Sequence, residues 1–531
     1  MYVVMIGTAG NQRYIFSSGK RQEIVGASDL IARVDGAWAD EALEKVFRGF
    51  VKSEWRIESH DAELLVAGAG GITVLVRDQE AGRRLVTELT RRALKEAPGL
   101  DVCGVVVEYV PGELADAIGR ARTELAAVRE ARPGPQARFL RLPLVEDCAS
   151  SGLPAEAIRF EGKGEPAQPR SAAAVAKLDA YRPALDRMAA VGNAHTGRRA
   201  MRGIVDELGL NTEWVAVVHA DGNGLGELFR TLGESVRGEG DRAYADALRA
   251  FSLGVDRCGK GAFQEALRRT TEELGGEGPL PVLPLVLGGD DLTVVCAGEV
   301  ALPFTRHYLE AFEKETAAEP LLAPMLARSG RTNLGAGAGV AIVKRNYPFH
   351  FAYELAEKLT EVEAKGVKGW GSALAFVVLF ESAAPDLKRI RASVTLSGGS
   401  GGTASPYLVG EGSEDARARG RRWADLQRRV DALNLRETGS KEPLIPRSAA
   451  HDLREGVCLG EEVAASRFGL LLRRFEKDRE RREALMELTE EGELLWTDHV
   501  HGDHAHGAKK VTGLLDAMTA QRFLKVKEEA R

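Results

Sequence analysis

Two short apolar stretches joined by a turn stand out at residues 286–296, which read V-L-G-G-D-D-L-T-V-V-C. Runs rich in Val and Leu on either side of a glycine-containing turn predict a β-hairpin. Two adjacent aspartates, Asp290 and Asp291, lie at its tip. Neighbouring strand residues point to opposite faces, so one carboxylate can face a metal ion while the other braces the turn or joins a second ion.

A second apolar strand is predicted upstream, at residues 215–218, and it leads into D-G-N-G-L-G at residues 221–226. Glycines in such a loop let backbone amides approach a phosphate closely. Asp221 stands at the end of this strand. A carboxylate at a strand end and carboxylates at a hairpin tip form the arrangement that two-metal phosphoryl transfer needs. Each motif alone is a weak signal, but their order along the chain favours the functional interpretation.

The N-terminal part of the chain repeats this pattern. Residues 65–74, L-V-A-G-A-G-G-I-T-V, align without gaps with residues 285–294, and residues 2–11 align with residues 214–223. The three acidic positions fall on small residues in the first copy: Ala9, Gly70 and Gly71. The sequence therefore predicts one repeat with an acidic site and one degenerate repeat that keeps the hairpin but lacks the ligands.

Both copies predict the order β-α-β-β-α-β, the ferredoxin-like arrangement that also forms the core of polymerase and cyclase palm domains. The first copy predicts a strand at 3–6, a helix at 39–50, a hairpin at 63–76, a helix at 81–94 and a strand at 102–109. In the second copy, the strand at 215–218 is followed by helices at 242–253 and 261–273 and by the hairpin. A helix at 301–316, a strand at 337–343, a helix at 353–364 and a strand at 374–379 complete it. The predicted fold class is α+β.

Composition predicts four segments. They are a degenerate palm-like domain at 1–112, a helical linker at 113–211, the palm with the acidic site at 212–385 and a helical C-terminal domain at 386–531. The Ser/Gly run at 397–403 predicts a loop, because Pro406 and not a helix follows it. The charged run at 474–488 predicts a solvated helix with one apolar stripe.

The overall composition narrows the class of protein. The 531 residues predict three or four domains, and 44% hydrophobic residues is ordinary for a soluble protein. No stretch resembles a membrane-spanning helix or a secretory signal, so no membrane is expected. Five cysteines without a C-x-x-C pair predict a reducing cytoplasm and no zinc ribbon. A formal net charge of −6 gives no support for binding nucleic acid by charge alone.

With these motifs, the chain resembles the large polymerase-like subunit of type III CRISPR effector complexes, or a stand-alone relative of it. The resemblance rests on G-G-D-D at 288–291, the loop at 221–226 and the degenerate N-terminal copy. It extends to G-A-G-V-A-I-V-K-R-N-Y-P at 337–348 and to the lysine-containing A-K-G-V-K at 364–368. At the N-terminus it includes residues 11–30.

The resemblance implies that the palm pair joins ATP into cyclic oligoadenylates, second messengers that switch on defence effectors. Mg²⁺ or Mn²⁺ is the implied cofactor, and effector subunits and RNA are possible partners. The implied metal ligands are Asp221, Asp290 and Asp291, flanked by His219. The residues expected near the nucleotides are Gly222, Asn223, Gly224, Gly288, Gly289, Lys365 and Lys368. The implied acceptor pocket in the first palm is lined by Ser17, Ser18 and Lys20 and by Gly26, Ala27 and Ser28.

The chain also departs from that family. No His-Asp pair precedes the first palm, so an HD nuclease domain and cleavage of single-stranded DNA are not expected. The zinc-binding cysteines that many members carry between the palms are missing. If the chain is a stand-alone relative, activation by RNA is in doubt.

Other interpretations stay open. A GGDEF-type cyclase making a cyclic dinucleotide would use similar chemistry, although the usual Phe-Lys after the first aspartate is absent. A non-catalytic scaffold that binds nucleotide or RNA is a third class, and retention of all three aspartates speaks against it. The histidine-rich segment D-H-V-H-G-D-H-A-H-G at 498–507 predicts an exposed loop, with adventitious metal binding as the alternative.

Overall fold

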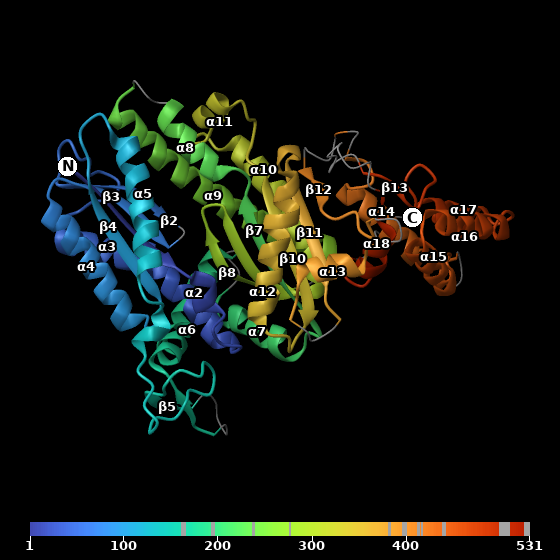
Figure 1. The fold of residues 1–531 in the computed structure, drawn as a ribbon, viewed down its shortest axis with the longest axis horizontal. Coiled ribbons are helices and arrows are strands. Elements are labelled where there is room, and N and C mark those ends of the chain that lie inside the picture. The colour runs from blue at the N-terminus through green and yellow to red at the C-terminus, as the bar shows by residue number, and fades with distance from the viewer. Residues whose placement is uncertain are drawn as a thin grey trace.

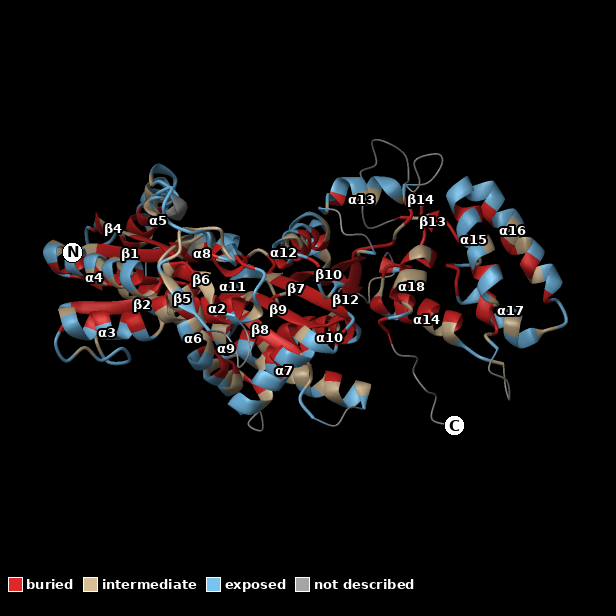
Figure 2. Ribbon diagram, turned by 90° about the horizontal axis from the view of Figure 1, so that it is seen from below, coloured by how far each residue is buried: buried red, intermediate tan, exposed pale blue. Residues whose placement is uncertain are grey.

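The computed structural model describes residues 1–531 apart from 69, 161–165, 193–196, 236–238, 276–277, 381–383, 396–400, 411–414, 416–417, 438–441, 499–509 and 525–531. Two sheets with their helices lie side by side, and a group of C-terminal helices follows the second sheet (Figure 1). The α+β fold class is therefore confirmed. Strands of both sheets are largely buried, whereas the outer faces of many helices are exposed (Figure 2). The histidine-rich segment lies outside the described residues except for Asp498.

The first repeat is a four-stranded antiparallel sheet in the order β2-β3-β1-β4. Its strands are β1 (Tyr2–Ala9), β2 (Ala62–Gly68), β3 (Gly71–Val76) and β4 (Asp101–Glu108). Its helices are α1 (Asn11–Ile15), α2 (Arg21–Asp35), α3 (Ala37–Val46) and α4 (Gln79–Glu96). The sequence analysis did not predict α1 or α2.

The second sheet repeats this order and adds two strands, giving β12-β11-β10-β7-β9-β8. Its strands are β7 (Trp214–Gly222), β8 (Val282–Gly288), β9 (Asp291–Ala297), β10 (Ala336–Lys344), β11 (Ser372–Val378) and β12 (Tyr407–Val409). The two hairpins even share a register shift, at 64/66 in the first copy and at 284/286 in the second. The internal repeat is thus present in three dimensions.

The helices of the second repeat are α8 (Leu225–Ser235), α9 (Asp241–Leu274), α10 (Gly298–Ala318), α11 (Ala323–Ser329) and α12 (Phe349–Lys358). A π-helical turn, η2 (Leu359–Glu363), and a 3₁₀ segment, η3 (Ala364–Trp370), continue α12. Helices α10 and α12 pack on β7 and β10. Part of the stretch predicted as a phosphate loop, residues 225–226, begins α8 instead.

The prediction of two helices at 242–253 and 261–273 is wrong, because α9 is one continuous helix. Glycines occupy positions 254, 259 and 261 in its middle. The apolar spacing nevertheless continues through Phe251, Val255, Cys258 and Ala262, all of which are buried. The glycines permit close packing instead, since a Cβ at Gly254 would lie 2.9 Å from the Leu322 side chain.

The remaining elements belong to the linker and to the C-terminal part. The linker contains α5 (Leu114–Ala131), η1 (Pro135–Arg138), β5 (Ala157–Arg159), β6 (Gln168–Arg170), α6 (Ala172–Val191) and α7 (Arg198–Leu210). The C-terminal part contains α13 (Leu387–Ser393), α14 (Trp423–Asn434), α15 (Arg447–Leu459), α16 (Glu461–Arg474), α17 (Arg479–Met486), β13 (Trp496–Thr497), β14 (Lys510–Val511) and α18 (Leu514–Ala520).

The charged run at 474–488 contains the predicted helix, α17, which begins at Arg479 after a turn. Helix α16 ends at Arg474, and Asp478 caps α17 by accepting a hydrogen bond from the Arg481 amide at 3.1 Å.

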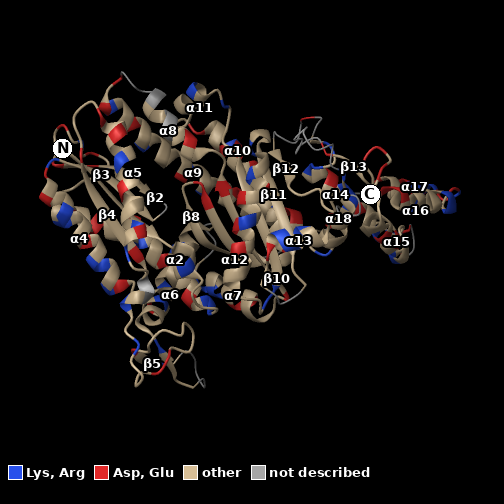
Figure 3. Cartoon of the chain, in the orientation of Figure 1, with Lys and Arg blue, Asp and Glu red and all other residues tan. Residues whose placement is uncertain are grey.

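Strand β12 lies beyond residue 385 yet pairs with β11 of the second sheet. Lys and Arg are interspersed with Asp and Glu over the helices (Figure 3). Within the described residues, no helix is long and apolar enough to cross a membrane.

Gly26 shows how tightly the linker packs on the first repeat. A Cβ at this position of α2 would overlap the backbone carbonyl oxygen of Lys177 in α6. We expect Gly26→Ala to lower the free energy of unfolding by about 1–3 kcal/mol, because the helices must move apart. Gly119→Ala in α5, with no atom within 4 Å of its new Cβ, serves as the control and should be neutral or slightly stabilising. Urea unfolding of both variants measures the difference, and equal midpoints would contradict this packing.

Candidate active site

The three predicted acidic residues come together at the end of the second sheet. In the hairpin, Gly288 pairs with Asp291, so Gly289 and Asp290 form the turn. Gly289 has a positive φ of 63°, a conformation that glycine adopts without strain. Strands β7 and β9 are antiparallel neighbours with Ala220 opposite Leu292. Asp221 and Asp291 are therefore the next cross-strand neighbours.

Gly222 brings the turn close to Asp221. A Cβ on Gly222 would lie 2.8 Å from Cβ and 2.9 Å from Oδ2 of Asp290. The Asp290 side chain thus lies directly over the Gly222 backbone, next to Asp221. The glycine that was expected near a phosphate instead makes room for a carboxylate.

Three acidic groups lie close together in a partly buried site, and two of them have raised pKa values. Burial, then the charges of Asp221 and Asp291, raises the pKa of Asp290 to about 8. Burial and the charge of Asp221 likewise raise the pKa of Asp291 to about 7, while Lys365 opposes the rise. Neighbouring buried carboxylates repel one another when they are charged. A bound cation relieves this repulsion, so the site favours a cation as its ligand.

Lys365 supplies one positive charge. Its Nζ forms an ion pair with Oδ2 of Asp221, from η3 across to the end of β7. The π-helical turn η2 immediately precedes η3, and such turns often occur at functional sites. Lys368, the other lysine expected to reach a triphosphate, is exposed on η3. In the structure, therefore, Lys365 but not Lys368 contacts the acidic residues.

His219 lies on β7, two positions before Asp221, and is buried. Burial lowers the pKa of its imidazole to about 4, so the ring is neutral near pH 7. Its Nδ1 lies 3.2 Å from the Thr293 hydroxyl. His219 flanks the acidic residues as a neutral, hydrogen-bonded group.

The loop after Asp221 is held by neighbouring loops. The Asn223 amide donates to Gly335 O at 2.8 Å, and its Nδ2 donates to Gly371 O at 3.0 Å. A Cβ on Gly224 would lie 3.3 Å from the guanidinium of Arg331, whose Nη1 donates to Asn223 O at 3.4 Å. Sequence reasoning missed Arg331, since no local motif connects it with a loop more than a hundred residues upstream.

The residues expected to form the acceptor pocket separate into two groups. Ser28 is buried, donates to the Leu285 carbonyl of β8, and accepts from Arg187 at 2.8 Å. It therefore lies between the two repeats. The hydroxyl of Ser17 accepts from Lys177 at 2.7 Å, and that of Ser18 accepts from the Lys20 amide at 3.0 Å. Both of these hydroxyls are hydrogen-bonded to lysines that do not line the cavity between the repeats.

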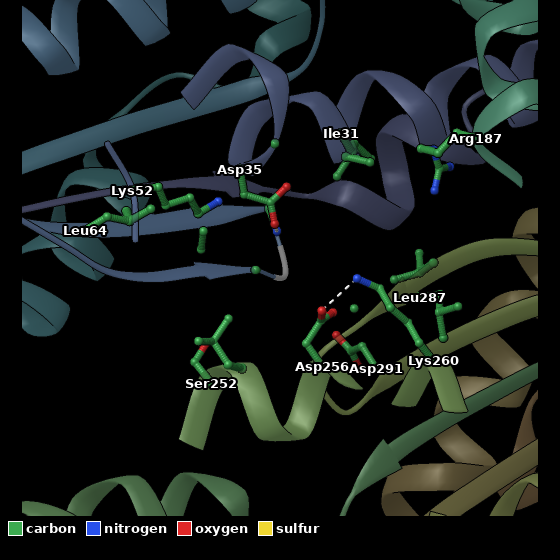
Figure 4. A pocket seen from close by; sticks show the side chains of 18 of the residues that line it. Ile31, Asp35, Lys52, Leu64, Arg187, Ser252, Asp256, Lys260, Leu287 and Asp291 are labelled. Carbon is green, nitrogen blue, oxygen red and sulfur yellow. Dashed lines mark hydrogen bonds and ion pairs between the residues drawn. The ribbon is translucent and has the colours of Figure 1, made fainter. Parts of the chain in front are cut away.

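That cavity has a volume of about 1020 Å³ and opens between the two hairpins (Figure 4). Gly68 and Gly70 line it from the first hairpin, and Gly288 and Asp291 line it from the second. Its other polar residues include Ser28, Asp35, Arg187, Arg249, Asp256 and Lys260. A space of this size lies at the upper limit of the usual range for a small-ligand site.

The degenerate hairpin carries a different carboxylate nearby. Asp35, at the end of α2, accepts a hydrogen bond from the Gly70 amide at 3.1 Å. Burial raises the pKa of Asp35 to about 6. Sequence reasoning missed Asp35, Arg187, Asp256 and Lys260, because they come from helices without a recognisable motif.

The donor set suits a hard divalent ion. In the described part of the chain, no three His, Cys, Asp or Glu side chains stand close enough to ligate a single ion together. Mg²⁺, however, usually takes only one or two protein carboxylates and fills its shell with water and phosphate oxygens. Asp221, Asp290 and Asp291 supply such carboxylates, so the residues fit the ion.

Comparison with known families decides what kind of domain this is. Residues 214–372 match the family model described as Cas10/Cmr2, second palm domain. This segment resembles a Cas10-type palm. The predicted resemblance is therefore confirmed, and the match contains all three aspartates and Lys365. No curated protein matches the chain.

Solved structures of Csm1–Csm4 cassettes also resemble the chain. The apo cassette aligns at 13% identity over 92% of this chain and 68% of that chain, with a TM-score of 0.44. The complex with cA4 aligns at 13% identity over 83% and 63%, with a TM-score of 0.41. The complex with cA3 aligns at 14% identity over 83% and 63%, also with a TM-score of 0.41. The chain thus spans less than two thirds of the length of two of these, and nothing about ligands follows from likenesses at this level.

Proposed function

We propose that the chain is a metal-dependent nucleotidyltransferase that joins ATP into cyclic oligoadenylates in a CRISPR-type antiviral response. The observation that carries the proposal is the meeting of Asp221, Asp290 and Asp291 beside a cavity shared by an acidic and a degenerate repeat. The match of residues 214–372 to a Cas10/Cmr2 palm supports it. Effector subunits and RNA are the corresponding partners.

The cavity provides room for a donor and an acceptor nucleotide. The donor triphosphate lies against the second hairpin, next to Asp291 and Lys365, and the acceptor lies against the first, whose turn lacks the three aspartates and has Asp35 nearby. A ribose hydroxyl of the acceptor attacks the α-phosphorus of the donor. An O–P bond forms, the bond to pyrophosphate breaks, and the hydroxyl proton is released to solvent.

The residues of the chain act mainly by placement and charge. Asp221, Asp290 and Asp291 would hold Mg²⁺ or Mn²⁺, which when bound neutralises phosphate charge and lowers the pKa of the attacking hydroxyl. Gly222 keeps Asp290 at its short distance from Asp221. Lys365, released from Asp221, would pair with the triphosphate. Holding both nucleotides between rigid hairpins removes most of the entropic barrier.

The direct test incubates the purified protein with labelled ATP and Mg²⁺, with and without added RNA, and separates the products. We expect oligoadenylates, with one pyrophosphate released per bond. Parallel reactions with GTP discriminate a GGDEF-type activity, which would yield a cyclic dinucleotide. A folded protein that binds ATP and Mn²⁺ yet forms no bond under any of these conditions would be a binding scaffold and would contradict the proposal.

Substitution of Lys365 should affect nucleotide binding more than substitution of Lys368. Lys365 reaches the acidic group, whereas Lys368 is exposed on the same segment. A charge-assisted contact to a phosphate is worth about 1.5–3 kcal/mol, so Lys365→Ala should weaken ATP binding about tenfold or more. Lys368→Ala should stay within about twofold. Calorimetric titration with ATP in Ca²⁺ measures both, and equal losses would contradict the assignment of Lys365.

A further inference from the structure

Helix α9 contacts hairpin strands of both repeats, as α2 also does. It runs for 34 residues, Asp241–Leu274, and packs against β2 of the first repeat and β8 of the second. Figure 1 shows it between the two sheets. At 1.5 Å per residue, an unbroken helix transmits position along its length without a flexible joint.

The first half of α9 is fixed to the first repeat through Glu63 of β2. The Glu63 carboxylate is fully buried and accepts hydrogen bonds from Arg242 at 2.6 and 2.7 Å, from Arg249, and from the Ile57 amide at 2.8 Å. Burial alone would raise the pKa of Glu63, but these donors lower it to about 2. Arg249 also donates to the Leu64 carbonyl at 3.0 Å. The carboxylate is therefore charged and held by two arginines that lie about two turns apart on α9.

The middle of α9 abuts the turn that carries the acidic site. A Cβ on Gly259 would lie 2.5 Å from the carbonyl oxygen of Gly289, so the helix backbone and the turn are in direct contact. One helical turn earlier, Asp256 Oδ1 lies 3.5 Å from the Gly289 amide. Its Oδ2 pairs with Lys260 at 2.7 Å (Figure 4). Both the backbone N–H and the carbonyl oxygen of Gly289 thus face α9.

We propose that Glu63, Arg242 and Arg249 are positioning residues for the acidic site. They fix α9 on the degenerate repeat, and α9 in turn fixes the Gly289–Asp290 turn that sets the spacing of Asp290 from Asp221. The degenerate repeat then has a second role besides lining the cavity, because it holds the metal ligands of the other repeat in register. This inference rests on the proposed function of the acidic site.

The test measures Mn²⁺ binding by electron paramagnetic resonance, without any catalytic step. Glu63→Gln removes the charge that both arginines contact, and it should weaken Mn²⁺ binding roughly five- to tenfold, the lower end of the usual coupling between sites. Glu58→Gln is the matched control, because Glu58 pairs with the same Arg242 but is 58% exposed. It should leave Mn²⁺ affinity within about twofold. Should Glu63→Gln fail to fold, Arg249→Lys weakens the same contact more mildly and should shift affinity in the same direction.

A double-mutant cycle separates positioning from general loss of stability. If the Glu63 cluster acts through α9, Glu63→Gln and Gly259→Ala disturb the same turn, and their effects on Mn²⁺ affinity should not add. Additive effects, or wild-type Mn²⁺ affinity in Glu63→Gln with a lowered unfolding temperature, would overturn the inference. The proposed function fails separately: it is contradicted if Asp290→Asn with Asp291→Asn binds Mn²⁺ as tightly as the wild type.

Discussion

Replacing Asp290 and Asp291 together by asparagine should abolish oligonucleotide synthesis, with a loss of at least about a thousandfold. The two carboxylates share a small volume with Asp221, and the amides that replace them are poor ligands for Mg²⁺. Loss of metal-assisted charge neutralisation costs several kcal/mol of transition-state stabilisation, which corresponds to this factor. Product formation from labelled ATP measures the effect.

The same substitution should stabilise the protein when metal is removed. Burial and mutual repulsion raise the pKa of both carboxyl groups, so the folded protein bears an electrostatic cost that neutral asparagine does not. In EDTA the double variant should unfold at a higher temperature than the wild type, and added Mn²⁺ should stabilise only the wild type. Glu357→Gln is the control: Glu357 acts on Asp291 only through its charge, and its loss should preserve synthesis. Full activity of the double variant would refute the site.

The second large effect is expected at Gly222. An alanine there would place its Cβ 2.8 Å from Cβ of Asp290, closer than such atoms approach in folded proteins, so the Asp290 side chain must move away from Asp221. Displacing a ligand by about 1 Å can cost about a hundredfold in rate. We expect Gly222→Ala to lose about this much synthesis and to weaken Mn²⁺ binding. Its new Cβ would also overlap Cδ1 of the buried Leu225, so a lower unfolding temperature is expected as well.

Gly226→Ala, four residues further on, is the matched control. No atom lies within 4 Å of the Cβ it would gain, and Gly226 belongs to α8, where alanine is the better helix former. Its activity should equal that of the wild type. If both variants kept full activity, or both lost it equally, the prediction would be contradicted. The close approach of Asp290 to Gly222 would then not determine the position of the metal ligands.

Much of the fold was predictable because its signals are local. Apolar runs on either side of a glycine turn predicted both hairpins, and the aligned repeat predicted the shared strand order. Helices α1 and α2 escaped prediction, and α9 was predicted as two helices, because helix packing rather than local propensity stabilises these segments. The predicted domain boundaries and the roles of the site residues stay predictions.

The sequence by itself determined that two hairpins of one design occur in the chain, and that only the second bears Asp290 and Asp291. That information lies in spacing and residue type, which act over a few positions. Only the tertiary structure decided which groups meet: Lys365 with Asp221, and Glu63 with Arg249. These partners lie 144 and 186 residues apart, so no local pattern encodes them. Their contacts arise because the two sheets and α9 pack against one another. Burying a charged group is costly unless it is paired, so each of these groups contacts the opposite charge that the packing brings beside it.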